Sequence, residues 1–181
     1  MKVNAIRFRW AWTTLGGLAC FAVLAAIDLK LKAESGFGAV DLQHAQTAGD
    51  VQRIAMAWQS PRHAAMAGFG LGFDYLFMPL YGFAFYYGTL MARDAFAPAT
   101  GAIRRLLTML AAVPLAGAIF DAIENALETY MLVNGPAEPL ALYAYTATGA
   151  KMVCFFIGLV MMLIGIMGLF KRKPAAEGDG S

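Results

Sequence analysis

Four long runs of apolar residues, separated by shorter polar segments, dominate the hydrophobic pattern of the chain. They cover approximately residues 10–28, 69–91, 106–132 and 140–170. A membrane-spanning helix needs roughly 20 mostly apolar residues, and within lipid only helices and closed barrels satisfy their backbone polar groups. The runs lack the alternation of barrel strands. We therefore predict an all-α protein, an integral membrane four-helix bundle.

The segment between the first two runs, residues 30–66, is too long for a simple connection. Thr47 and Asp50 have the spacing of a helix N-terminal cap, and Ser60-Pro61 marks an end. Between them, apolar residues recur at the spacing of one helix face, which is typical of an amphipathic helix: Val51, Ile54, Ala55 and Trp58. We predict a short extracytoplasmic amphipathic helix between spans one and two, capping the bundle.

The composition agrees with a membrane protein, since 60% of the 181 residues are hydrophobic, 14% are charged and the mean hydropathy is +0.58. Soluble domains have roughly 45–50% apolar and about 25% charged residues. We predict a single transmembrane domain over residues 1–173 and a disordered cytoplasmic tail over 174–181. A cleaved signal peptide is the alternative for the first run, but its apolar core of about 18 residues exceeds the usual 7–15.

Basic residues flank the runs unevenly, and loops rich in Lys and Arg remain in the cytoplasm. They precede run one, follow run four and separate runs two and three: Lys2, Arg7, Arg9, Arg93, Arg104, Arg105, Lys171, Arg172 and Lys173. The short loop near Gly135 has none. We expect a multi-pass protein of the inner (plasma) membrane with cytoplasmic N and C termini. The basic residues act as membrane anchors, so we expect membrane lipids as partners and no nucleic acid.

A polar stripe interrupts the third run, in the sequence FDAIENALE. Asp121, Glu124, Asn125 and Glu128 share one helix face, and charged groups within a span face the bundle interior or a water-filled cavity. At about 1.5 Å of rise per residue, Asp74, Glu124 and Lys151 lie at similar distances from the cytoplasmic ends of their predicted spans. Asp28 in the first span lies at a similar distance. We predict one polar layer, with these candidate ligand-binding residues: Asp74, Tyr75, Tyr81, Asp121, Glu124, Asn125 and Lys151.

We expect Lys151 to pair with Glu124 or Asp121, because the third and fourth spans are joined by a short loop. A purely structural bridge between these helices is the alternative, but it leaves Asp74 unexplained. The surplus of carboxyl groups implies protonation, a bound cation or cationic ligand, or access of water. Pro79 and Pro114 predict kinks that open the bundle.

The sequence favours no metal and no cofactor. Cys20 and Cys154 fall in predicted spans and are expected to be buried apolar residues. His44 and His63 lie outside the spans, and no known nucleotide, haem or zinc motif is present.

Three stretches carry a resemblance: FDYLFMPLYGFAF (73–85), PLAGAIFDAIENALE (114–128) and ATGAKMVCFFIGL (147–159). They resemble a family of uncharacterised bacterial four-span membrane proteins with Asp-aromatic-Leu-Phe, Asp-x-x-Glu-Asn and last-span Lys segments. The resemblance implies the four-helix fold and marks the shared polar positions, without implying an activity.

The expected function is binding of a lipid-like or small amphiphilic ligand, or of a membrane partner, by the buried carboxylate and lysine layer. Two alternatives stay open. One is an intramembrane acid–base enzyme acting on a lipid-like substrate, and the other is a proton- or cation-coupled carrier working as an oligomer. The sequence leaves open whether the protein is an enzyme, the ligand, and whether it forms a homo-oligomer.

Overall fold

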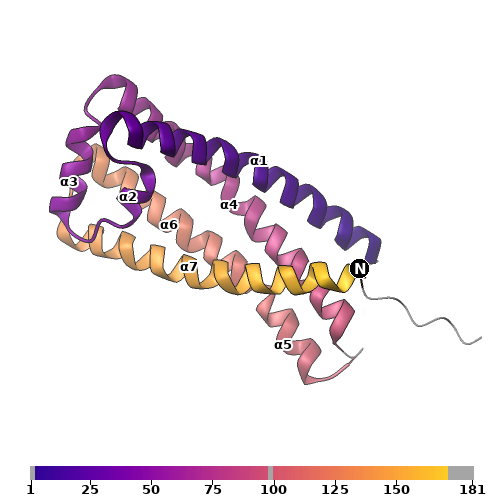
Figure 1. Ribbon diagram of the computed structural model, residues 1–181. Coiled ribbons are helices and arrows are strands. Elements are labelled where there is room, and N and C mark those ends of the chain that lie inside the picture. The colour runs from indigo at the N-terminus through magenta and orange to yellow at the C-terminus, as the bar shows by residue number, and fades with distance from the viewer. Residues whose placement is uncertain (1–2, 98–99, 171–181) are drawn as a thin grey trace, which may run out of the picture.

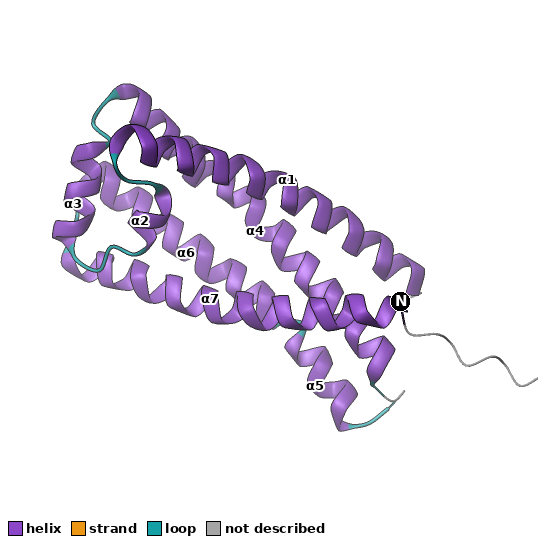
Figure 2. Cartoon of the chain, in the orientation of Figure 1, coloured by secondary structure: helices purple, strands orange, loops and turns teal. Residues whose placement is uncertain are grey.

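Four long helices lie side by side in one elongated bundle (Figure 1). The computed structural model describes residues 3–97 and 100–170. The long helices are α1 (Val3–Ser35), α4 (Pro61–Phe96), α6 (Val113–Asn134) and α7 (Glu138–Met167). Figure 2 shows helices joined by short loops, and no strand occurs in the described residues. The prediction of an all-α helical bundle is confirmed.

Helix α4 is the central element, because it packs against α1, α6 and α7. Helices α6 and α7 also pack along each other, whereas α1 packs mainly against α4. Glycine permits the closest approach between α4 and α7: a Cβ atom at Gly165 would overlap the carbonyl oxygen of Gly88. The bundle interior is therefore formed by α4, α6 and α7, with α1 along one side.

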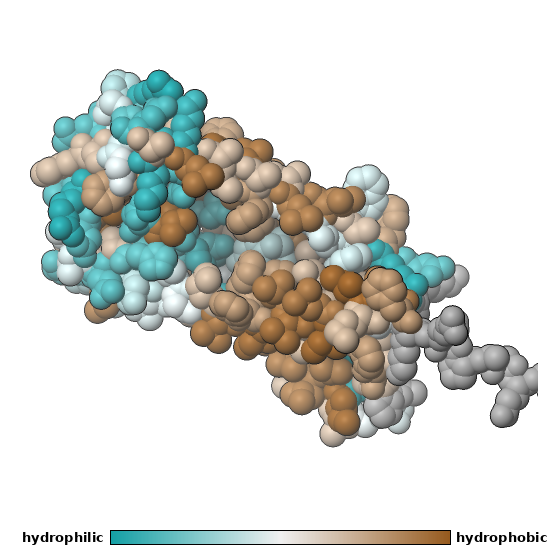
Figure 3. Space-filling view, in the orientation of Figure 1, coloured by the Kyte–Doolittle hydropathy of each residue, from teal (hydrophilic) through white to brown (hydrophobic). Residues whose placement is uncertain are grey.

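Three helical segments are long and apolar enough to cross a membrane: Asn4–Ser35, Ala102–Asn134 and Glu138–Phe170. The remaining predicted span, residues 69–91, lies inside α4, which is long enough but less apolar because it contains Asp74 and several tyrosines. Figure 3 shows hydrophobic side chains over the middle of the bundle and hydrophilic ones over the end that carries α2 and α3. By length and composition, three of the four predicted spans are supported.

The predicted amphipathic helix is present as α3 (Ala48–Ala57), preceded by the short helix α2 (Ala39–Gln43). The Thr47 hydroxyl accepts from the backbone N–H of Asp50, whose carboxylate accepts from the backbone N–H of Thr47. Trp58 is buried beyond the end of α3, and its indole N–H lies 3.0 Å from the carbonyl oxygen of Phe37. The same indole N–H donates to Ser35 Oγ at 3.1 Å, so Trp58 fastens the α2–α3 segment to the C-terminal end of α1.

The third predicted span, residues 106–132, lies within the apolar segment Ala102–Asn134, but a turn divides it into two helices. The chain turns at Ala111 and Ala112, which separate α5 (Ala102–Leu110) from α6, and α5 points away from the bundle (Figure 1). Pro114 lies in the first turn of α6 rather than at a mid-helix kink. Proline is tolerated there because the first N–H groups of a helix have no intrahelical partner. Pro79 does lie inside α4.

The remaining boundaries differ modestly from the predictions. Helices α1 and α4 extend beyond the apolar runs, and α7 continues into the short 3-10 helix η1 (Gly168–Phe170). Because α1 continues to Ser35, the Asp28 carboxylate meets α2, where it accepts from the backbone N–H of Val40 at 3.2 Å. Asp28 therefore caps α2 instead of joining the predicted layer. The predicted tail and the Lys171–Lys173 anchor lie outside the described residues.

Candidate ligand-binding site

One face of α6 carries four polar side chains that are almost fully removed from the surface. Their exposed fractions are 4% for Asp121, 0% for Glu124, 0% for Asn125 and 1% for Glu128. The spacing of three and four residues aligns them on the helix, and α6 presents this face to α4 and α7. Burial of this many polar groups is costly unless they find partners.

Lys151 on α7 supplies two of those partners. Its Nζ atom donates to Asp121 Oδ1 at 2.8 Å and to Glu124 Oε1 at 2.9 Å. The short connection between α6 and α7 makes them antiparallel neighbours, which brings residues 30 and 27 positions apart into contact. The predicted pairing of Lys151 is confirmed, with both acids rather than one.

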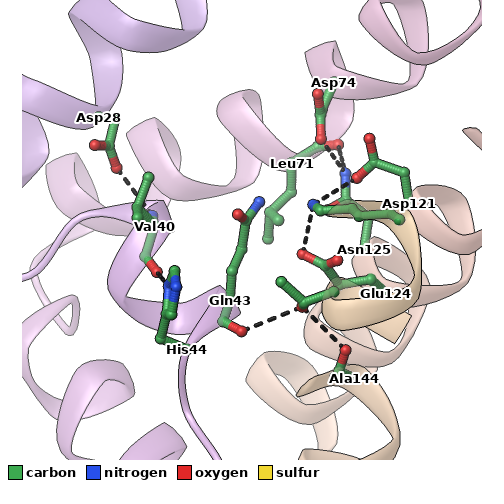
Figure 4. Close-up of polar contacts among 12 residues, drawn as sticks. Asp28, Val40, Gln43, His44, Leu71, Asp74, Asp121, Glu124, Asn125 and Ala144 are labelled. Carbon is green, nitrogen blue, oxygen red and sulfur yellow. Dashed lines mark hydrogen bonds and ion pairs between the residues drawn. The ribbon is translucent and has the colours of Figure 1, made fainter. Parts of the chain in front are cut away.

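Helix α4 contributes to the same cluster. The Tyr81 hydroxyl donates to Asp121 Oδ2 at 3.0 Å. The amide nitrogen of Asn125 donates to Asp74 Oδ2 at 2.9 Å and to the carbonyl oxygen of Leu71 at 3.3 Å (Figure 4). Asp74 and Tyr81, seven residues apart, thus face the α6 acids from one side of α4.

Of the seven candidates, the structure brings together all but Tyr75. The Tyr75 hydroxyl donates to the backbone oxygen of Ala122 at 3.2 Å, and its side chain is exposed. We call the following set the polar cluster: Asp74, Tyr81, Asp121, Glu124, Asn125, Glu128 and Lys151. Glu128 belongs to it because it lies within electrostatic range of Asp74, Asp121, Glu124 and Lys151.

Several acceptors of the polar cluster have no partner. Among the described residues, no hydrogen bond reaches Glu124 Oε2, Asn125 Oδ1 or either carboxyl oxygen of Glu128. Four carboxyl groups face the single ammonium group of Lys151, so full ionisation would leave an excess of three negative charges. The cluster therefore has acceptors and negative charge in excess of donors and positive charge.

Helices α2 and α3, together called the cap, cover one end of the cluster. The hydroxyl of Thr148, one turn before Lys151, donates to the carbonyl oxygens of Gln43 in α2 at 3.2 Å and Ala144 at 3.1 Å. In Figure 4 the Gln43 side chain extends from α2 into the space between Asp28 and Leu71. Apolar residues of the cap and the helix ends form one buried core around this contact: Leu31, Leu42, Ala45, Val51, Ile54, Trp58, Ala67, Met131, Ala141 and Ala144.

Sequence reasoning missed two members of this region. Gln43 gave no signal, because nothing local indicates that α2 folds back over α7. Glu128 was recognised as part of the polar stripe but was not among the candidate ligand-binding residues. Its position one helical turn after Glu124 was the available signal, since residues four apart share a face.

An open apolar groove of about 450 Å³ lies between α4 and α6, beside the polar cluster. Its walls come from both helices and contain no charged side chain: Tyr75, Met78, Pro79, Ala118, Ile119, Ala122, Ile123 and Ala126. Tyr75 links the two regions, because it lines the groove and directly follows Asp74 in the chain. The two regions together offer a polar and an apolar surface to one molecule.

The histidines and cysteines lie apart from the cluster. His44 is hydrogen-bonded to the carbonyl oxygen of Val40, and His63 lies 3.6 Å from Glu34. Cys20 is buried and Cys154 is half-buried. No group of three or more His, Cys, Asp or Glu side chains arranged to hold a metal ion occurs within residues 3–97 and 100–170.

No protein-family model, curated protein or solved structure matches this chain. The resemblance to four-span membrane proteins therefore stays an expectation.

Proposed function

We propose that this chain is a four-span membrane protein that binds a lipid-like amphiphile, with the polar head at the polar cluster and the hydrocarbon chain in the groove between α4 and α6. The observation that carries the proposal is the set of unpartnered acceptors on Glu124, Asn125 and Glu128. Polar groups buried without partners are uncommon and call for an explanation. A ligand that brings hydrogen-bond donors supplies one.

The groove supports an amphiphile over a small polar ligand. It is apolar, open to the surroundings of the bundle, and adjacent to the cluster through Tyr75. Apolar pockets with a few polar groups at one end are typical of ligand sites. A hydrocarbon chain lying against Ala118, Ala122 and Ala126 would remain in contact with the membrane interior.

The arrangement of α4 supports its crossing the membrane as a fourth span. Helix α4 packs between α1 on one side and α6 and α7 on the other, so a bilayer around those three helices would surround it as well. Arg93, Arg104 and Arg105 lie at the end opposite the cap, where the N-terminal residues Arg7 and Arg9 also lie. This distribution supports cytoplasmic termini.

Native mass spectrometry of the gently extracted full-length protein tests the proposal. We expect a bound amphiphile in the wild-type spectrum. Ala126→Phe, which adds bulk to an exposed position lining the groove, should reduce the bound fraction several-fold. Val153→Phe is the matched control, because Val153 is exposed on α7 and does not line the groove. A wild-type protein without bound amphiphile, or equal loss in both variants, would contradict the proposal.

A further inference from the structure

The polar cluster has a chemical preference that narrows the class of amphiphile. Every unpartnered atom in it is an oxygen: Glu124 Oε2, Asn125 Oδ1, Glu128 Oε1 and Glu128 Oε2. The only cationic side chain of the cluster, Lys151, already donates to Asp121 and Glu124. A head group that itself brings negative charge, such as a phosphate or a carboxylate alone, would add to the excess of acceptors.

We infer that the amphiphile carries a protonated primary amine, which binds at the Asp74–Asn125 edge of the polar cluster. This inference rests on the proposed function. An ammonium group offers three N–H donors and one positive charge, which answers both the surplus of acceptors and the surplus of carboxyl groups. Hydrogen bonds between ions are stronger than those between neutral groups, so charge and donors act together.

At the Asp74–Asn125 edge of the cluster, Asp74 is the more accessible of the two residues. Asp74 is half-buried, whereas Glu124, Asn125 and Glu128 are buried. Asp74 Oδ2 accepts from the amide nitrogen of Asn125, and the oxygen of that same amide has no partner. An ammonium group beside Asp74 would therefore find a carboxylate and an amide oxygen within one contact region.

On the face of the molecule shown in Figure 3, a hollow with hydrophilic atoms at its floor lies between α1 and α7. This hollow exists because α1 packs mainly against α4 and does not pack extensively against α7. The Gln43 side chain points from α2 toward Leu71, whose carbonyl oxygen accepts from Asn125 (Figure 4), and no hydrogen bond of the Gln43 side chain occurs within the described residues. Its amide oxygen would be a further acceptor for the amine.

Binding of dodecylamine to the purified full-length protein in a neutral detergent tests the inference, with dodecanol and dodecanoic acid as probes of equal chain length. Isothermal titration calorimetry near pH 7 should give a dissociation constant for dodecylamine at least about tenfold below that for dodecanol, because a hydrogen bond between charged groups exceeds one between neutral groups. Dodecanoic acid should bind more weakly than either. Dodecyltrimethylammonium keeps the charge but has no N–H donor, so it should bind more weakly than dodecylamine.

Two variants locate the amine. Asp74→Asn should weaken dodecylamine binding by about tenfold and leave dodecanol binding nearly unchanged. Gln43→Ala should weaken dodecylamine binding by a few-fold, and it is expected to fold because its side chain holds no other residue. Glu138→Gln, which removes an exposed carboxylate at the same end of the bundle, is the control and should change neither affinity.

The outcomes separate the two proposals. Equal affinity for dodecylamine and dodecanol would overturn the amine preference while leaving the amphiphile function in place. Absence of binding by all four probes would overturn both. An equal effect of Glu138→Gln and Asp74→Asn would show attraction to the general negative charge of this end rather than a site. If Asp74→Asn does not fold, the Gln43→Ala result decides the location.

Discussion

Lys151 on α7 donates a hydrogen bond of 2.9 Å to Glu124 on α6, whose side chain has no exposed surface. Lys151 also donates to Asp121, so one ammonium group holds two acids of the adjacent helix. A buried ion pair of this kind stabilises weakly relative to an apolar pair, but breaking it from one side leaves an uncompensated charge. This asymmetry makes the pair testable.

Lys151→Met should lower the free energy of unfolding by about 3–5 kcal/mol, because Asp121 and Glu124 lose the one cationic partner they have among the described residues. Adding Glu124→Gln should recover part of that loss, since the double variant removes one of the two stranded carboxylates. Thermal unfolding of the single and double variants in detergent gives the coupling. Simple additivity of the two effects would contradict the pairing.

Trp58→Phe should open the cap locally. Its indole N–H donates to Ser35 Oγ at 3.1 Å and to the backbone oxygen of Phe37 at 3.0 Å, and the ring is 4% exposed. Phenylalanine keeps most of the apolar contact but lacks the N–H donor, so the free energy of unfolding of the cap should fall by about 1–3 kcal/mol. Trp12→Phe is the control, because Trp12 is exposed.

Hydrogen–deuterium exchange measures the effect of Trp58→Phe. Faster exchange over α2 and α3, with unchanged exchange over α6, is the expected pattern. A uniform increase along all helices would indicate that the cap and the bundle unfold as one unit, and the idea of a separately opening cap would then fail.

The cap should also loosen in acid. The hydrogen bond from the Thr47 hydroxyl, followed by that from Arg53, holds the pKa of Asp50 below its ordinary value of 3.8. A folded-state pKa below the unfolded one contributes stability above the unfolded pKa, which is lost as pH falls through the folded pKa. Acrylamide quenching of Trp58, with Trp10 and Trp12 replaced by Phe, should therefore increase between about pH 5 and about pH 2.

Asp50→Asn provides the check on this pH effect, because the amide side chain of asparagine does not ionise in that range. Quenching of Trp58 should change less between the same two pH values in this variant. An identical acid response in both proteins would assign the opening to other carboxyl groups of the cap, such as Asp41, whose pKa is also lowered: burial opposes ionisation there, but the Gly38 N–H and Lys32 outweigh it.

Gly165→Ala should separate α4 and α7. The added methyl group would overlap the backbone of Gly88, which cannot move without shifting α4. We expect the free energy of unfolding to fall by roughly 1–3 kcal/mol or more, the range for overpacked cores. Gly149→Ala on the same helix is the matched control, since nothing lies near its Cβ position; it should be neutral or stabilising by roughly 0.5–1 kcal/mol. Equal effects on the melting temperature would refute the close packing.

Reporter fusions test the topology. A fusion after Ser181 should report the cytoplasm and one at Gly135 the opposite side, because basic residues flank the termini and the α4–α5 region but not the α6–α7 loop. Both fusions on one side of the membrane would exclude the four-span arrangement.

The elements that sequence reasoning predicted well depend on local signals. The capping residues Thr47 and Asp50 are read from neighbouring positions, and α3 begins where they indicate. It ends at Ala57, before the predicted end at Ser60-Pro61, and these two residues instead begin α4. The pairing of Lys151 with Asp121 and Glu124 followed from helix periodicity and a short loop. Adjacent antiparallel helices leave few choices, so these contacts were accessible without tertiary information.

The features that were missed depend on contacts between distant segments. The turn at Ala111 and Ala112 lies in an apolar run that composition alone reads as continuous. Gln43 reaches Thr148 across 105 positions, and Asp28 meets Val40 only because α1 is longer than its apolar run. Such placements follow from how the cap folds onto the bundle, which no local pattern specifies.

Glu128 separates a structural role of the cluster from a functional one. It is 1% exposed and neither carboxyl oxygen has a partner in the described residues. Replacing an unpartnered buried polar group by an apolar one of similar size removes the desolvation cost, so Glu128→Met should raise the free energy of unfolding by about 1–3 kcal/mol. The same variant should weaken dodecylamine binding, because it removes one negative charge from the cluster. A gain in stability with a loss of binding is the pattern of a residue retained for function at a cost in stability. If thermal unfolding instead shows Glu128→Met to be destabilising and titration shows unchanged binding, Glu128 supports the packing of α6 and the proposed site does not include it.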